Sequence, residues 1–133
     1  METSSALADL SEISSQIEVA VVFGSDGAVL GSTVSDEGRS QRLAQAALGL
    51  VAAAEAAGTP GRKLTQIEAS LREGSVFVVS GEGRGIAAST TPEPTSGLIF
   101  YDLRTCLRSL EDEADEPAPA KPARRKKQEA QDA

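Results

Sequence analysis

The sequence predicts an α+β domain built on a five-stranded, mainly antiparallel sheet. Short apolar or alternating segments of strand length are joined in two groups by glycine-containing turns. Three other segments carry apolar residues at helical spacing. The segments 17–23 and 75–80 are apolar on both strand faces, so helices must cover both sides of the sheet. The predicted order is α-β-β-α-β-β-β-α.

The N-terminal part predicts a helix followed by a hairpin. Residues 4–15 form a weakly amphipathic helix that Ser4 or Ser5 caps. Its apolar residues are Leu7, Leu10 and Ile13. Residues 17–23 read IEVAVVF and predict a strand buried on both faces. The Asp26-Gly27 pair predicts a tight turn into a return strand at 28–34.

Residues 36–57 predict one long helix. Acidic residues at 36 and 37 suit its positive N-terminal end, and Gly58-Thr59-Pro60 ends it. We expect an apolar stripe to lie on the sheet, formed by Leu43, Ala46, Ala47, Leu50, Val51 and Ala54.

The opposite side of this helix is nearly uncharged and carries mostly small side chains. We expect it to consist of Gln41, Gln45, Leu48, Gly49, Ala52 and Ala56. Eight of the fifteen residues 43–57 are alanine, and one interpretation is that alanine is simply the best helix former. The other interpretation is a close contact with a helix of another chain. Leu48 and Gly49 together favour the contact.

The C-terminal part predicts three strands and a helix. Residues 63–72 alternate between polar and apolar, which is typical of a strand at a sheet edge. Residues 75–80 predict a buried strand and residues 86–90 the last one. Residues 96–110 predict a helix with a buried stripe of Ile99, Leu103, Cys106, Leu107 and Leu110.

The composition excludes several kinds of chemistry. Histidine is absent and Cys106 is the single cysteine, so neither a Ser-His-Asp triad nor a disulfide within the chain is possible. The run Gly81-x-Gly83-x-Gly85 is either a phosphate loop or a hairpin, and the strand that follows it favours the hairpin. Cys106 lies on an apolar helix stripe and is better explained as a core thiol than as a nucleophile. We therefore expect no catalytic residue, metal or cofactor, and no enzyme.

Charge and hydropathy limit the partners and the location. The net charge of -7 argues against nucleic-acid binding. No apolar run approaches the roughly 20 residues of a transmembrane helix, and the N-terminus lacks a basic signal region. With a single cysteine, these features predict a cytoplasmic protein.

The sequence divides into a domain, residues 1–110, and a tail, residues 111–133. The tail has no apolar residue larger than Ala or Pro and is predicted to be disordered. Its basic block, Arg124 to Lys127, either binds an anionic surface or is part of a solvated polyampholyte. The acidic residues beside it favour the second interpretation.

The order and spacing of four segments resemble the Roadblock/LC7 family over about residues 6–110. These segments are VAVVFGSDGAVLGS (19–32), RLAQAALGLVAAAE (42–55), EGSVFVVSGEG (73–83) and SGLIFYDLRTCLRSL (96–110). The resemblance implies a five-stranded antiparallel sheet with one long helix on one face and two terminal helices on the other. The small last strand, IAAST, and the tail depart from the family pattern.

The resemblance also implies a function. Family members form dimers in which the long helices pair and the third strands join edge to edge, and they bind Ras-like small GTPases. We therefore expect a homodimeric, non-enzymatic regulator of such a GTPase, either GAP-like or a co-regulator. An assembly scaffold without effect on GTP turnover is the alternative, and a small-molecule sensor is a third.

We expect the GTPase to touch charged residues that border the long helix. The candidates are Glu37, Arg39, Arg42 and Glu55. Arg42 is either a specific contact, because a guanidinium binds a carboxylate in a bidentate way, or an ordinary solubilising arginine.

Overall fold

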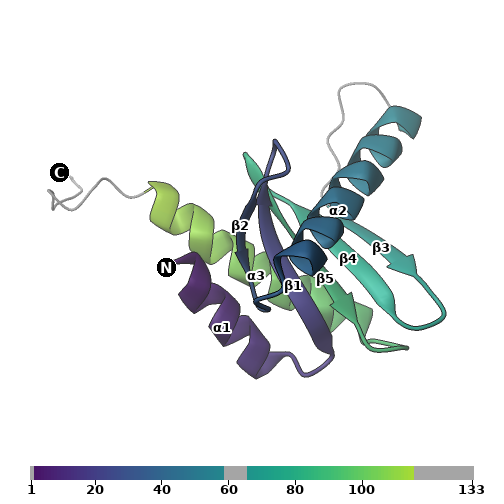
Figure 1. The fold of residues 1–133 in the computed structure, drawn as a ribbon, viewed down its shortest axis with the longest axis horizontal. Helices are drawn as coiled ribbons and strands as arrows, with labels where there is room; N and C mark the ends of the chain where they lie inside the picture. Colours follow the sequence, from purple (N-terminus) through teal and green to yellow (C-terminus); the bar gives the residue numbers. More distant parts are fainter. Residues whose placement is uncertain (1, 59–65, 116–133) are drawn as a thin grey trace, which may run out of the picture.

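The computed structural model describes residues 2–58 and 66–115 and contains three helices and five strands (Figure 1). In chain order these are α1 (Thr3–Ile13), β1 (Ile17–Gly24), β2 (Val29–Ser32), α2 (Glu37–Ala57), β3 (Gln66–Ser70), β4 (Ser75–Ser80), β5 (Arg84–Thr90) and α3 (Ser96–Asp115). This order and the α+β class confirm the prediction from the sequence. Within these residues, no helix is both long and apolar enough to cross a membrane.

The sheet has the order β2-β1-β5-β4-β3, and every neighbouring pair is antiparallel. The central strands β1 and β5 pair along most of their length, with Val21 opposite Ala87. Strand β3 lies at one edge, as its alternating sequence predicted, and β2 lies at the other.

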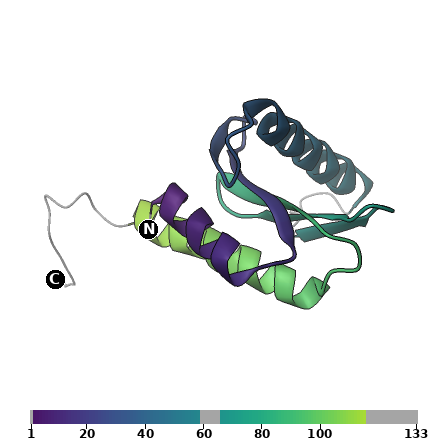
Figure 2. The same ribbon diagram turned by 60° about the horizontal axis from the view of Figure 1, so that its bottom comes forward.

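Helix α2 covers one face of the sheet, and α1 and α3 together cover the other (Figures 1 and 2). Because side chains alternate between the two faces along β1, this strand contributes residues to two separate cores. Ala20 and Val22 pack with α1 and α3, whereas Val21 and Phe23 pack with α2. The strand is buried on both faces from Val19 onward, which confirms the prediction for its apolar run.

Two details of helix α1 differ from the prediction. The helix begins at Thr3 with Glu2 as its N-cap, so neither Ser4 nor Ser5 caps it. Ile13 is the last residue of α1 and is 64% exposed, so it does not continue the buried stripe of Leu7 and Leu10.

Helix α3 runs to Asp115, five residues beyond the predicted end at 110. The extension is acidic and contains no residue that breaks a helix, and the first proline after it is Pro117. The helix therefore includes residues 111–115, which the prediction assigned to the tail. Residues 116–133, with the basic block, lie outside the described residues.

Candidate functional site

Helix α2 is fixed to the sheet at its first turn. The Asp36 side chain accepts a hydrogen bond from the backbone N–H of Arg39 at 3.1 Å, as an N-cap does. The Ser40 hydroxyl is buried and donates to Ser32 Oγ on β2 at 2.7 Å. This contact joins the first turn of α2 to the edge strand β2.

The sheet-facing side of α2 is lined by small residues. Ala44 and Ala47 are fully buried, and Leu43, Leu50 and Val51 are half-buried beside them. The predicted stripe is therefore largely correct. Ala46 is exposed and was predicted wrongly, because the buried line runs through Ser40, a polar residue that the apolar pattern could not include.

The outward side of α2 has no charged residue between Arg42 and Glu55. We define the outer face of α2 by its exposed residues Gln41, Gln45, Gly49, Ala52 and Ala56. These five were predicted to point outward, and each of them is exposed. A Cβ built on Gly49 would meet no atom within 4 Å, so this face is open and smooth around the middle of the helix.

Leu48 does not belong to this outer face. It is half-buried and packs against the core beneath α2. Its Cδ1 lies 3.0 Å from the place that a Cβ on Gly27 would occupy. Gly27 has φ +90 in the turn between β1 and β2, so a glycine is favoured there both by backbone and by space. Leu48 thus closes the turn, and its prediction as an outward contact was wrong.

The four predicted rim residues fall into two groups. Glu37, Arg39 and Arg42 lie in the first two turns of α2, and Arg39 and Arg42 line a shallow cavity of about 410 Å³ with residues of β1 and β5. Glu55 lies near the other end of the helix, about 20 Å further along its axis. The two arginines therefore line one cavity together, whereas Glu55 lines a different pocket at the C-terminal half of α2.

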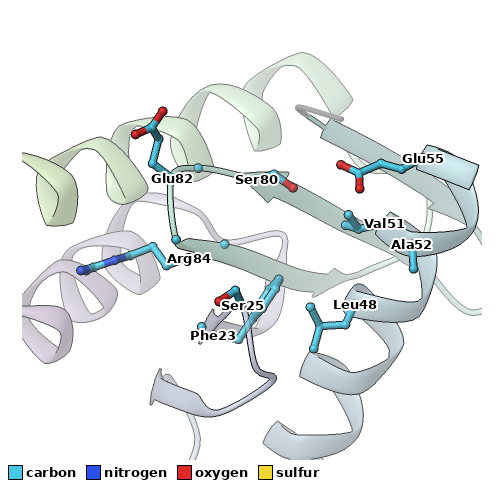
Figure 3. Close-up of a pocket in the computed structure, with 13 residues that line it drawn as sticks. Phe23, Ser25, Leu48, Val51, Ala52, Glu55, Ser80, Glu82 and Arg84 are labelled. Atoms are coloured by element: carbon cyan, nitrogen blue, oxygen red, sulfur yellow. The ribbon is translucent and has the colours of Figure 1, made fainter. Parts of the chain in front are cut away.

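A pocket of about 610 Å³ opens at the C-terminal half of α2, and we call it the α2 pocket (Figure 3). Phe23, Leu48 and Val51 form its apolar surface. Glu55, Ser80 and Glu82 contribute polar groups. The pocket joins three segments that are far apart in the sequence: the end of β1, the second half of α2 and the turn between β4 and β5.

The glycine-rich run forms a hairpin, as favoured from the sequence. Gly81 N–H donates to the Arg84 carbonyl at 2.8 Å, and Gly83 has φ +77. A strand follows this turn, so no helix N-terminus faces the α2 pocket from it. Glu55, Glu82 and Arg84 all line the pocket, and the Glu82 carboxylate and the Arg84 guanidinium both point away from Leu48 (Figure 3). The pocket is better suited to an apolar side chain than to a phosphate.

Cys106 is buried on α3, and its burial and the charge of Asp9 raise the pKa of its thiol to about 11. A thiol with so high a pKa is a poor nucleophile near neutral pH, which confirms the interpretation as a core thiol. Across residues 2–58 and 66–115, no three metal-ligating side chains of the His, Cys, Asp or Glu type gather in one place.

Two features were missed in the sequence. The α2 pocket depends on the folding together of three distant segments, so no local pattern could indicate it. The second is Asp102, a buried carboxyl on α3. A signal for it did exist, since Asp102 falls on the apolar stripe between Ile99 and Cys106.

No family model matches the sequence, and no curated protein matches it either. Several solved structures are similar to this chain in fold. A Roadblock/LC7 domain from Streptomyces avermitilis has a TM-score of 0.75 and 21% identity, over 82% of this chain and 94% of that chain. The gliding protein MglB from Thermus thermophilus has a TM-score of 0.73 and 15% identity, over 87% and 90%. MglB in a tetrameric arrangement has a TM-score of 0.70 and 14% identity, over 81% and 84%.

Proposed function

On the Roadblock/LC7 fold of this chain, we propose a cytoplasmic homodimer that pairs through the outer face of α2 and regulates a Ras-like small GTPase. The observation that carries the proposal is this outer face, which exposes small uncharged side chains over the whole middle of a 21-residue helix. Solvent-facing helix surfaces normally carry charged residues opposite the apolar stripe.

The outer face suits the close approach of a second helix. Gly49, Ala52 and Ala56 present at most a methyl group, so two such helices can pack at the short end of the usual 8–10 Å axial distance. A close approach maximises dispersion contacts between backbones, and no charge has to be desolvated in the contact. The similarity to MglB in a tetrameric arrangement supports a chain that associates with copies of itself.

The edge strand β3 offers a second contact between the two subunits. Its polar side chains are held on the α3 side, where Glu68 accepts from the Ser96 hydroxyl and Gln66 from Arg104. β3 pairs with β4 alone among the described strands. An exposed strand edge pairs readily with another chain, and joining two β3 edges would give one continuous sheet.

Regulation of a GTPase is supported by the fold neighbours and by the two arginines of α2. The neighbours include the gliding protein MglB, and the resemblance of the sequence to the Roadblock/LC7 family implies regulation of a Ras-like GTPase. Arg39 and Arg42 are exposed at one end of the outer face, where they can steer and orient an acidic partner. The chain would act by binding and positioning the GTPase.

The dimer is tested by placing glutamates at Ala52 and Ala56. Both positions are exposed in the subunit, so the A52E/A56E chain should fold, but it would bury unpaired charge in the pair, which costs several kcal/mol. Sedimentation velocity should show monomers for this variant. A matched control places glutamates at Ser4 and Ala8, which are exposed at the same spacing on α1. A dimer of unchanged affinity in A52E/A56E would refute the interface.

The regulatory role is tested by GTP hydrolysis of a Ras-like GTPase from the same organism. We expect the wild-type chain to change the hydrolysis rate and A52E/A56E to lose this effect. Binding of the GTPase with an unchanged rate would instead establish the assembly scaffold.

A further inference from the structure

Helices α1 and α3 lie on the opposite side of the sheet from α2 (Figure 2), and residues of both helices line a second groove. It encloses about 270 Å³. Its lining residues come from both helices: Ala6, Asp9, Leu10, Ile13, Asp102, Thr105, Cys106 and Ser109. We call it the α1–α3 groove.

Asp102 is the unusual member of this groove. The residue is only 6% exposed, and its side chain has no hydrogen bond or ion pair with any other described residue. Its neighbours Leu103, Cys106 and Ile99 belong to the core. A buried carboxyl group without a partner is costly, so a domain that keeps one is less stable than it would be with a neutral residue there.

The other lining residues give the groove a negative and partly apolar character. Asp9 adds a second carboxylate from α1, and no basic residue lines the groove. Leu10 and Ile13 form the apolar wall, and Ile13 is largely exposed at its end. Thr105 and Ser109 add hydroxyl groups from α3, and the Ser109 hydroxyl donates to the Thr105 carbonyl.

We propose that the α1–α3 groove is a docking site for an arginine side chain of a partner protein, with the Asp102 carboxylate receiving the guanidinium. A guanidinium donates up to five hydrogen bonds and is weakly hydrated, so it suits a site that combines a carboxylate, hydroxyl oxygens and an apolar wall. Its methylene stem would pack on Leu10 and Ile13. The groove lies on the far side of the sheet from the outer face of α2, so the proposal does not depend on the proposed dimer or GTPase.

A metal ion and an anion fit the groove less well. Two carboxylates line it without a third carboxylate or an imidazole, and no metal-type cluster is found in the described residues. Its negative charge disfavours an anion. Burial raises the pKa of Asp102, which is the direction expected for a carboxyl group that lacks its cationic partner.

The proposal predicts opposite effects of one substitution on stability and on binding. Asp102→Asn removes the buried charge, so the melting temperature of the full chain at pH 7 should stay the same or rise. The same substitution should weaken binding of an arginine side chain at least fivefold. A residue kept for function at a cost in stability shows this pair of effects, whereas a purely structural residue loses stability when it is replaced.

The binding probe is the dipeptide acetyl-Leu-Arg-amide, titrated into the ¹⁵N-labelled full chain and followed by NMR. We expect saturable, millimolar-range shifts of amides in residues 6–13 and 102–109. The matched peptide with citrulline has the same shape without the charge and should give no saturable shift. Glu12→Gln on α1 is the control variant, since Glu12 is exposed and does not line the groove.

Three results would overturn the proposal. These are equal binding of the citrulline peptide, unchanged affinity in Asp102→Asn, and shifts confined to the α2 side. A measurement on the wild-type chain covers the case in which Asp102→Asn fails to fold. The ¹³C NMR signal of the Asp102 side-chain carboxyl is followed over a pH series. The signals of Asp9 and Cys106, which also face the groove, are followed in the same series. The arginine peptide should lower the Asp102 pKa, and an unchanged pKa at saturating peptide would refute the pairing.

Discussion

Gly49→Ala is expected to stabilise the subunit and to weaken the dimer. Gly49 lies near the middle of α2, is exposed, and has open space where a Cβ would be. Replacing an exposed glycine by alanine inside a helix stabilises it by about 1 kcal/mol. For a domain of this size that raises the melting temperature by about 4 °C.

The same methyl group has the opposite effect in a helix pair. The two-fold axis of a homodimer presents each change twice, so two added methyl groups would enter one close contact. Overpacking of a tight contact costs about 1–3 kcal/mol, and every 1.4 kcal/mol is a factor of ten in affinity. We therefore expect the dimer dissociation constant to rise about tenfold.

The two effects are separated by protein concentration. Thermal unfolding at a concentration well below the dimer dissociation constant reports the subunit, and sedimentation over a concentration series reports the dimer. Gly97→Ala is the control, because Gly97 is exposed near the start of α3 and also has open space at its Cβ. A higher melting temperature with an unchanged dissociation constant in Gly49→Ala would show that α2 does not pair through this face.

Three further predictions concern Arg42, the tail and Cys106. Arg42→Ala should weaken binding of the GTP-loaded GTPase without dissociating the dimer, and calorimetric titration should give two chains per GTPase, because one asymmetric GTPase across the two-fold axis blocks the second site. Equal affinity would remove Arg42 from the contact, and one GTPase per chain would exclude the straddling geometry. Removing residues 116–133 should change the melting temperature by less than about 4 °C, since that segment has no apolar residue larger than Ala or Pro; a larger drop would reveal lost contacts. The raised pKa of Cys106 favours the folded chain below pH 9, so about 2–3 kcal/mol of stability should be lost as the pH rises from about 9 to about 11. In Cys106→Ala, the free energy of unfolding measured with denaturant should depend less on pH over that range. An identical pH dependence in the variant and the wild-type chain would contradict the buried thiol.

The regular elements could be predicted from the sequence because their signals are local. The alternation of β3, the apolar run of β1 and the Asp36 cap of α2 each lie within a few residues. The five apolar residues predicted for the stripe of α3 are all buried, and only Asp102 was missed from it. The helix ends were less accurate, because the cap of α1 and the end of α3 depend on weak preferences that neighbouring residues share.

The errors in the candidate site have a common cause in tertiary contacts. The sheet-facing side of α2 includes Ser40, which is hydrogen-bonded to Ser32, and a hydropathy pattern places both of these polar residues outside. In this orientation Leu48 lies toward Gly27 and Ala46 toward solvent. The α2 pocket and the α1–α3 groove each combine distant segments, so their shapes follow only from the complete fold.

The separation of the interior into two cores has a consequence for how the molecule can be used. Each residue of β1 serves one core or the other, and the hydrogen-bonded sheet between them has no side chain common to both. Coupling between two sites requires an element with two arrangements that both ligands bias, and a central strand paired on both sides is a poor candidate for such an element. Binding of a partner at the α2 side should therefore leave the affinity of the α1–α3 groove unchanged, and the reverse should also hold. Under the two proposals, the chain would hold one partner while exchanging the other.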